Sequence, residues 1–435
     1  MLRHKKWSRK MKKKFLLQIA KAALINQISY LSDELDLFHI AVGPVFKVAQ
    51  YFSLMPLQNI MSSDPYRVEF KYASVAVLRT GCFLFFGGIQ LVLILTDYIS
   101  AGITTSNIVG IFFFSCGLSA CVLFACLAGN WPELIKYWTK VEVVFLQPPY
   151  KQSNFSLKYK IRIAAAIVGV LYAVEHGLFF ASDVFNYRMS KSMCHSEVPP
   201  SYRDYLTNHF MGYIFDHIYY HILISVPILI LNSVFTFIWN YMDLFIILVS
   251  LGLAQRFQQI GERALELSEK SVPQCTWREV RLHYVQLCEL VDVVDGKISW
   301  IILLSSVNNL YFICYQILNI FNKLHWPINY VYFWYSFLYL LGRTAFVFLC
   351  ASKIHDESKV PLLALRSVPS AGWGDEVERF SIQISSECVA LSGRKLFFIT
   401  RKLLFGMAAT IVTYELVLLQ LDDLTMGHNL GPLCG

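Results

Sequence analysis

Long runs of apolar residues recur along the chain, and charged residues are concentrated in the segments between them. A helix needs about 20 mainly apolar residues to cross the roughly 30 Å hydrocarbon core of a bilayer. Seven runs reach this length, and the pattern therefore predicts an all-α membrane protein with seven transmembrane helices. The runs lie near residues 73–98, 103–129, 161–184, 217–240, 298–321, 328–352 and 397–419.

A weaker apolar segment, FHIAVGPVFKVAQYFSLMPL, covers residues 38–57 and precedes the seven runs. Gly43, Pro44, Lys47 and Gln50 interrupt it, and an interior proline disfavours an unbroken helix. We expect a re-entrant helix, which enters the membrane from one side without crossing it. The overall composition also fits a membrane protein, because 56% of the residues are hydrophobic and only 16% are charged.

The distribution of basic residues predicts the orientation of the helices. Outside the apolar runs, nearly all of the 38 Lys and Arg residues fall in the N-terminal segment and in the connections after the second, fourth and sixth runs. Only Arg188, Lys191, Arg203 and Lys323 fall on the opposite side. Basic residues are retained in the cytoplasm, so we expect a cytoplasmic N-terminus and an extracellular C-terminus. The net charge of +8 follows from this topology and does not indicate a nucleic-acid partner.

Several classes of function are disfavoured by the sequence. The predicted orientation is the reverse of that of a G-protein-coupled receptor, whose N-terminus is extracellular. The His and Cys residues have no metal-ligand spacing and no Gly-rich phosphate loop is present, so we expect no enzyme, metal or cofactor. His176 and His221 could face each other across helices, but binding and conduction are favoured over catalysis. Cys194 and Cys434, both on the outer side, form either a disulfide or two free thiols.

The outer halves of the third to sixth runs are rich in polar and aromatic residues. An ionisable side chain in a membrane helix costs several kcal/mol unless it is paired or faces water, so Glu175, His176 and His221 predict a water-filled cavity. Carboxylate, amide and imidazole groups beside Tyr and Trp rings suit a neutral polyol such as a sugar. The candidate ligand-binding residues are Glu175, His176, Asp183, His217, Tyr220, His221, Asn309, Tyr315, Gln316, Tyr332, Trp334 and Tyr335.

Two of these assignments have alternatives. Tyr332 and Trp334, like Tyr330, are also typical of the aromatic belt at a membrane interface. Deeper in the fourth run, Trp239, Asn240 and Asp243 lie on one short arc of the predicted helix. They form either the floor of the cavity or a buried network in which Asp243 pairs with Arg343 or Arg79.

The last apolar run ends in TYELVLLQLDD, where Thr413, Val417 and Gln420 share one helix face. One helix with a single polar stripe cannot enclose water, so a pore along it requires several copies around an axis. Rings of Val417, Gln420 and Leu421 would form the gate, since apolar rings close by excluding water. Rings of Asp422 and Asp423 at the mouth would favour cations.

These residues resemble a known family. TYELVLLQ is similar to the TYxxxxxQF signature that ends insect gustatory receptors, and Glu after TY resembles the sugar-sensing clade. GPVFKVAQYFSLMPL, FTFIWNYMDLFIILVSLGLAQRFQQI and VRLHYVQLCELVDVVDGKISWIILLSSVNNLYFICYQIL extend the resemblance over most of the chain. Leu421 replaces the usual Phe, which leaves the gate in place but alters its constriction.

The resemblance implies a sweet-taste receptor that is a ligand-gated, non-selective channel for Na, K and Ca ions. It implies a homotetramer, or a heteromer with related receptors, in the plasma membrane of gustatory receptor neurons. A mono- or disaccharide would bind an outward-open pocket in each subunit. Membrane lipid would surround the protein. A receptor of the same architecture for a non-sugar ligand and a metabotropic seven-helix receptor remain the alternatives.

The expected domains follow from these assignments. Residues 1–72 form a cytoplasmic N-terminal region with the re-entrant helix. Residues 73–352 form the ligand-binding region, whose cytoplasmic helical extensions lie at about 241–297. Residues 353–396 form a cytoplasmic anchor helix region, 397–421 the pore-lining helix and 422–435 an extracellular tail.

Overall fold

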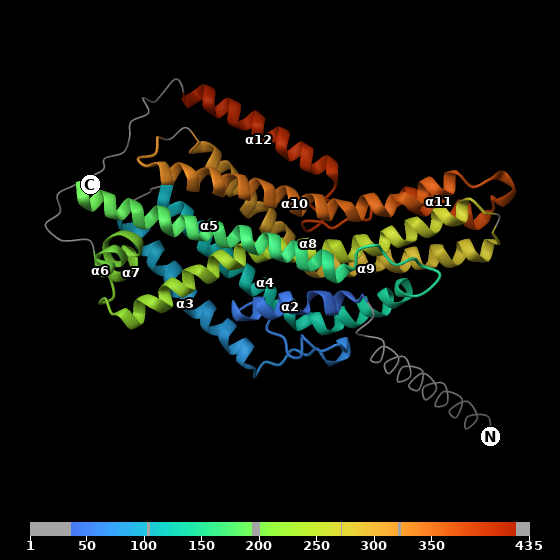
Figure 1. Cartoon of the computed structure of the whole chain (residues 1–435), viewed down its shortest axis with the longest axis horizontal. Helices are drawn as coiled ribbons and strands as arrows, with labels where there is room; N and C mark the ends of the chain where they lie inside the picture. The colour runs from blue at the N-terminus through green and yellow to red at the C-terminus, as the bar shows by residue number, and fades with distance from the viewer. Residues whose placement is uncertain (1–35, 102–104, 194–200, 271, 321–322, 423–435) are drawn as a thin grey trace.

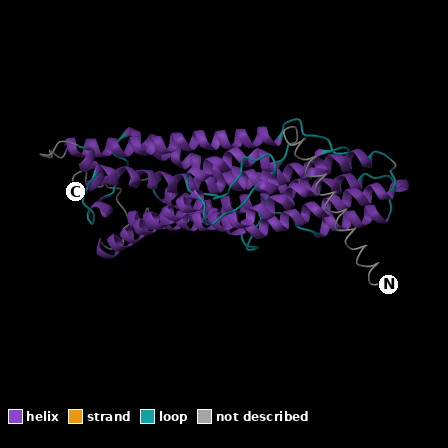
Figure 2. Ribbon diagram, turned by 90° about the horizontal axis from the view of Figure 1, so that it is seen from below, coloured by secondary structure: helices purple, strands orange, loops and turns teal. Residues whose placement is uncertain are grey.

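The computed structural model describes residues 36–101, 105–193, 201–270, 272–320 and 323–422, with side chains described except at 100, 101, 105–107 and 414–422. The described part is an elongated bundle of helices (Figures 1 and 2). The helices are α2 (Phe38–Tyr51), η1 (Pro65–Arg67), α3 (Val75–Ala101), α4 (Thr105–Glu142), η2 (Val143–Leu146), α5 (Leu157–Met193), α6 (Tyr202–Asp204), η3 (Tyr205–Phe210), α7 (Gly212–Phe215), α8 (Ile222–Ser268), α9 (Gln274–Leu318), α10 (Pro327–Arg366), η4 (Ser370–Gly372), α11 (Asp375–Ser386) and α12 (Arg401–Asp422).

Six of the described helices, α3, α4, α5, α8, α9 and α10, are long and apolar enough to cross a membrane. They cover most of each of the first six predicted runs, and α12 covers most of the seventh. The all-α membrane fold predicted from the hydropathy pattern is therefore confirmed. The orientation of the two termini relative to the membrane stays a prediction.

The longest helices extend well beyond the thickness of a bilayer. α8 has 47 residues and α9 has 45, which at 1.5 Å per residue gives lengths of about 70 Å. α8 begins at Ile222 rather than at residue 217, because the His221 side chain accepts a hydrogen bond from the Leu223 N–H and caps the helix there. The far halves of α8, α9 and α10 pack with α11 into a second bundle at one end (Figure 1).

α8 forms the centre of the molecule. It packs along α10 and also against α4, α5 and α9, and every side chain from Asn240 to Ser250 is buried. Gly117 on α4 allows this close packing, because a Cβ there would lie 2.4 Å from Cδ1 of Phe235 on α8. The walls of the bundle are therefore held at fixed positions around α8.

α2 is tied to the bundle by a buried ion pair. Arg256 on α8 lies 2.7 Å from Glu142 on α4, and both side chains are almost fully buried. Glu142 also accepts the backbone N–H of Phe38, at the start of α2. With 14 residues, α2 is only about 21 Å long and is shorter than a bilayer is thick.

Candidate functional site

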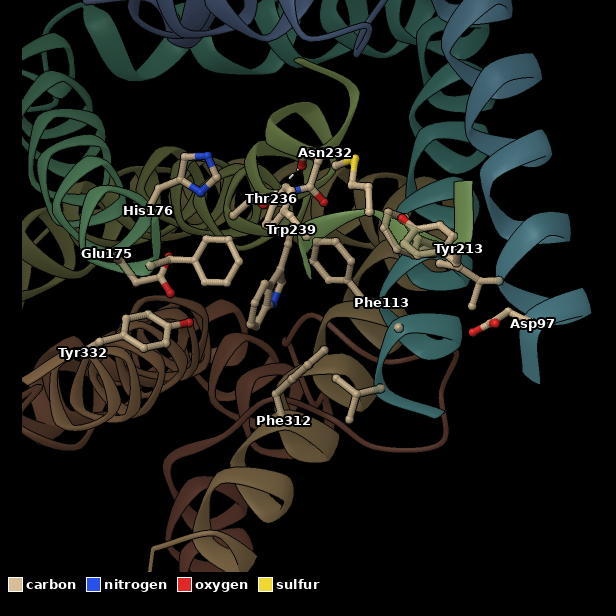
Figure 3. Close-up of a pocket in the computed structure, with 17 residues that line it drawn as sticks. Asp97, Phe113, Glu175, His176, Tyr213, Asn232, Thr236, Trp239, Phe312 and Tyr332 are labelled. Atoms are coloured by element: carbon tan, nitrogen blue, oxygen red, sulfur yellow. Dashed lines mark hydrogen bonds between the residues drawn. The ribbon is translucent and has the colours of Figure 1, made fainter. Parts of the chain in front are cut away.

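A cavity of about 420 Å³ lies between the six long helices, at the end of the bundle that carries α6 and α7. This volume lies within the range of about 300–1,000 Å³ that small-molecule sites usually have. Figure 3 shows Glu175 and Tyr332 on one side, Asp97 and Tyr213 on the other, and Trp239 between them. The cavity is lined by Ile94, Asp97, Val109, Gly110, Phe113, Phe114, Glu175, His176, Phe179, Phe210, Met211, Tyr213, Asn232, Thr236, Trp239, Phe312 and Tyr332.

One wall of the cavity is polar. Glu175 on α5 accepts a hydrogen bond of 3.2 Å from Ser336 on α10, and Ser336 accepts one of 3.3 Å from Gln316 on α9. This chain fixes the Glu175 carboxyl group at the junction of three helices. His176, the next residue, lies 3.2 Å from the Ser233 hydroxyl through Nε2. The wall thus offers both hydrogen-bond donors and acceptors to a ligand.

The face of α8 adds further polar groups and an aromatic ring. Asn232, Thr236 and Trp239 follow one another at spacings of four and three residues, so they lie on one side of the helix. Trp239 lies 4.6 Å from the ring of Phe312 on α9 and 6.2 Å from Phe113 on α4. A ligand in the cavity therefore meets flat rings next to an amide and a hydroxyl group.

A buried network supports Trp239 from the side away from the cavity. Arg343 lies 2.7 Å from Asp243, and the exposed fractions of the two side chains are 2% and 0%. Its guanidinium lies 4.8 Å from the Trp239 ring centroid. Asn309 donates to both Asp243 oxygens and accepts a hydrogen bond of 3.2 Å from the Trp239 indole. The network therefore joins α8, α9 and α10 behind the Trp239 ring.

This network decides between the two interpretations of the arc on α8. Asp243 pairs with Arg343, and Asn240 accepts hydrogen bonds from Arg343 and from Tyr339. Neither Asn240 nor Asp243 lines the cavity, whereas Trp239 does. Trp239 therefore lines the cavity, whereas Asn240 and Asp243 belong to the buried network beside it.

Residues 201–215 form the roof of the cavity, with Phe210, Met211 and Tyr213 facing inward. Gln90 donates a hydrogen bond of 2.8 Å to the Tyr213 hydroxyl. Burial raises the pKa of Tyr213 to about 12, so this hydroxyl stays neutral at ordinary pH. It can therefore donate a hydrogen bond to a ligand.

Two acidic residues tie this roof to the rest of the molecule. Asp183 accepts a hydrogen bond of 2.7 Å from Tyr205 and lies 3.2 Å from His209. Asp204 accepts one of 2.6 Å from Tyr187 and lies 3.0 Å from Lys191. The hydrogen bond from Tyr187, then those from Asn208 and Lys191, hold the pKa of Asp204 below its usual range. Asp183 thus holds the roof and does not line the cavity.

Four of the predicted ligand-binding residues line the cavity in the described structure, namely Glu175, His176, Trp239 and Tyr332. Gln316 reaches it indirectly, through Ser336. Tyr315 is half-buried on the same helix as Gln316.

The remaining predicted residues lie elsewhere. His217 and His221 are exposed in the turn before α8, and Tyr220 lies under the Arg203 guanidinium. Tyr335 donates to the Leu171 carbonyl oxygen. Trp334 is 44% exposed and does not line the cavity. Asn309 belongs to the buried network.

Residues of the first two spans are not among the predicted ligand-binding residues. Asp97 on α3 and Phe113 on α4 line the cavity, but nothing in their apolar surroundings distinguishes them. Asn232 and Thr236 could have been predicted from the sequence, because they continue the helix face of Trp239 toward the start of α8.

The predicted gate lies where side chains are not described. Val417, Gln420, Leu421 and Asp422 are within helix α12, outside the described side chains, and Asp423 is outside the described residues. Cys194 and Cys434 are outside them as well. Within the described ranges, no group of three or more His, Cys, Asp or Glu residues could hold a metal ion.

Comparisons with known proteins match nearly the whole chain. A family model described as trehalose receptor matches residues 8–429. The Drosophila melanogaster gustatory receptor for sugar taste 64a is 47% identical over 92% of this chain and 88% of its own. Gustatory receptor for sugar taste 61a, from the same species, is 44% identical over 90% of this chain and 89% of its own. Gustatory receptor 5a for trehalose, from the same fly, is 32% identical over 89% and 85%.

The fold is similar to that of a solved insect receptor. The olfactory receptor OR5 from Machilis hrabei superposes with a TM-score of 0.61 over 93% of this chain and 99% of its own, at 10% identity. The structure of its complex with eugenol superposes with a TM-score of 0.62 over 91% of this chain and 99% of its own, at 12% identity. At these identities the likeness concerns the fold alone.

Proposed function

The chain belongs to the trehalose receptor family, within the sugar-sensing insect gustatory receptors, and from this premise we propose that it is a sweet-taste receptor and a sugar-gated cation channel. The observation that carries the proposal is the cavity, in which a carboxyl, an imidazole and an amide group lie beside aromatic rings. Relatives named for sugar taste and for trehalose support the choice of ligand.

In the proposed complex, Glu175 and Asn232 bind sugar hydroxyls, and Trp239 packs against the apolar C–H face of the ring. Hydroxyl contacts exchange with water almost evenly, so we expect weak affinity, on the millimolar scale or about −4 kcal/mol. The sugar bridges α5, α8 and α10, and Phe312 brings α9 into the same contact. A sugar that fits one arrangement of these helices better than another shifts the receptor toward it.

The conducting part of the proposal concerns α12. Most of its described side chains, from Arg401 to Thr413, are exposed in the single chain, which supports burial against further copies in a tetramer or heteromer. Val417, Gln420 and Leu421 would then form the gate and Asp422 and Asp423 its vestibule, passing Na, K and Ca ions. The N-terminus would be cytoplasmic, in the plasma membrane of gustatory receptor neurons.

The main alternative is a receptor of the same architecture for a non-sugar ligand. The rings of Phe113, Phe179, Trp239 and Phe312 would also accept an apolar aromatic molecule. Such a ligand would leave Glu175 without a role in ligand binding, so the two functions are separable by one substitution. A metabotropic receptor is the second alternative, and it would require an extracellular N-terminus.

Sugar binding by the purified chain tests this proposal. Titration with sucrose, maltose, trehalose, glucose and fructose, followed by Trp fluorescence, should give saturable binding of at least one sugar. Glu175→Gln should weaken that binding about tenfold, because a charge-assisted hydrogen bond contributes roughly 1.5–3 kcal/mol. Glu378→Gln, at an exposed position on α11, is the matched control and should bind like the wild type. Binding of an apolar aromatic compound but of no sugar would support the alternative instead.

A further inference from the structure

A tight hairpin, residues 391–399, joins the anchor region to α12. Ser392 and Phe398 form an antiparallel β-bridge, and the Leu391 carbonyl oxygen accepts the N–H of Ile399 at 2.8 Å. The side chains of Leu391 and Ile399 are buried, so the base of the hairpin is fixed in the core. α12 begins two residues after Ile399, so the position of the hairpin sets the position of the helix.

The turn of this hairpin has a strained backbone. Arg394 and Lys395, its two central residues, have φ values of 54° and 61°, and the Gly393 carbonyl oxygen accepts the N–H of Leu396. Turns with two positive φ values strongly favour Asn-Gly, and Arg and Lys rarely adopt them. Such a conformation persists only where neighbouring groups hold it in place.

α9 provides the groups that hold this turn. The Asp295 carboxylate accepts the Ser392 N–H at 2.6 Å and the Ser392 hydroxyl at 2.8 Å, and it lies 3.1 Å from Lys395 Nζ. The Arg394 guanidinium lies 4.6 Å from the ring of Trp300. Asp295 is 1% exposed, so its carboxylate is committed to these contacts.

Few other polar contacts hold α12 against the bundle. Beyond the hairpin, a groove of about 560 Å³ between α9 and α12 is lined by Leu310, Leu403 and Gly406, among others. Arg401 pairs with Asp356 on α10 at 2.6 Å, but its side chain is 62% exposed, and exposed ion pairs contribute little. The contacts of Asp295 are therefore the main polar link between α9 and the start of α12 in the described structure.

We infer that Asp295 is a positioning residue for the gate, which transmits movement of α9 to α12 by holding the hairpin at residues 391–399. α9 runs without a break from Asp295 to Phe312, which lines the cavity. A displacement of α9 by the ligand therefore reaches the hairpin through one rigid helix. This inference rests on the proposed function, because it gives α12 the role of gate.

Two measurements on Asp295→Ala test the inference. In voltage-clamped cells, the maximal sugar-evoked current should fall about tenfold, a typical size for loss of coupling between sites. The sugar affinity of the purified chain and its amount at the cell surface should stay at wild-type values. In hydrogen exchange, peptides that cover residues 389–400 should take up deuterium faster than in the wild type.

Two further variants distinguish positioning from general structural support. Asp292→Asn is the matched control, because Asp292 lies 3.8 Å from the same Lys395 Nζ but is 78% exposed; it should behave like the wild type. Adding Arg394→Asn and Lys395→Gly to Asp295→Ala should restore slow exchange at residues 389–400 but not the current, because Asn-Gly adopts the turn without help from α9 and the link between α9 and the hairpin is still missing.

Three results would overturn the inference. They are a wild-type current in Asp295→Ala, a parallel loss of sugar affinity and current, and recovery of the current by the Asn-Gly turn, which would mean that Asp295 only supports the turn. A wild-type chain that binds sugar without conducting would contradict the proposed channel instead. Hydrogen exchange would still test the link through Asp295 in that case, and unchanged exchange at residues 389–400 would contradict it.

Discussion

Trp239 is the residue at which the cavity meets the interior of the bundle. Its ring lines the cavity, its indole N–H donates to Asn309, and the Arg343 guanidinium lies 4.8 Å from its centroid. These contacts hold the ring in one orientation before any ligand arrives. A preorganised ring loses less conformational entropy on binding, which matters for a ligand whose hydroxyl contacts contribute little net energy.

The Arg343 and Asp243 pair gives a prediction about stability. Removing one partner leaves an uncompensated charge in the core, which usually costs about 3–5 kcal/mol. Arg343→Met should therefore lower the free energy of unfolding by about that amount. The measurement is the apparent melting temperature of the purified chain in lipid nanodiscs. Replacing both partners, by Arg343→Met with Asp243→Leu, should recover most of the loss.

An exposed ion pair is the control for this prediction. Lys71 Nζ lies 2.9 Å from Glu69 Oε2, and the exposed fractions of the two side chains are 57% and 49%. Such exposed pairs contribute about 0–1 kcal/mol to the free energy of unfolding. Lys71→Met should leave the melting temperature nearly unchanged. An equal loss in Lys71→Met and Arg343→Met would contradict the structural role of the buried pair.

At the scale of elements, the roof of the cavity depends on its contacts with α5. Asp204 is the residue in this roof whose pKa gives a pH prediction. Its folded-state pKa lies below the unfolded value of about 3.9. Its stabilisation of the roof is therefore fully present above about pH 4 and is lost as the pH falls through the folded pKa.

Sugar affinity as a function of pH tests this contribution, because the ligand itself carries no charge. Wild-type affinity should weaken as the pH falls below about 4, since protonated Asp204 loses its ionic contact with Lys191. Asp204→Asn should bind more weakly at neutral pH and show a smaller loss on acidification. The same pH profile in the two proteins would mean that Asp204 does not hold the roof.

Much of the helical framework could be predicted from the sequence. The long apolar runs identify the membrane helices, and the near absence of Gly and Pro after Pro227 predicts that α8 continues far past the membrane. The start of α8 was less predictable. Asp216 to His221 continue the polar and aromatic pattern of the helix toward the N-terminus, but α8 begins only after His221, which caps it. Capping depends on backbone geometry that composition does not reveal.

The cavity could be predicted only in part, for a physical reason. Glu175 and His176 are conspicuous because ionisable groups are costly in a membrane helix. Phe113 and Phe312 look like any apolar residue, and only the rotation of α4 and α9 in the bundle turns them inward. Asp183 looked like a ligand-binding residue, yet it holds Tyr205 and His209 of the roof. Tertiary packing decides this difference.

At the scale of the whole molecule, the described helices leave α12 at an edge where the proposed assembly would place further copies. The core around α8 is closed and well packed. By contrast, α12 lies along one edge of the bundle (Figure 1) and, among the described helices, packs mainly against α9 and α10. A membrane protein that leaves a helix with a polar stripe at its edge has a natural place for further copies. The pocket and the proposed gate are then in different parts of one subunit.

The central claim is that a sugar opens a channel formed by this chain, and current from cells that express the chain alone tests it most directly. Oocytes under voltage clamp should give a cation current when sucrose, maltose, trehalose, glucose or fructose is applied. Gln420→Ala should change ion permeation or basal current while the order of sugar preference stays the same. Saturable sugar binding to the purified chain with no current to any of these sugars, or a changed sugar preference in Gln420→Ala, would contradict the account.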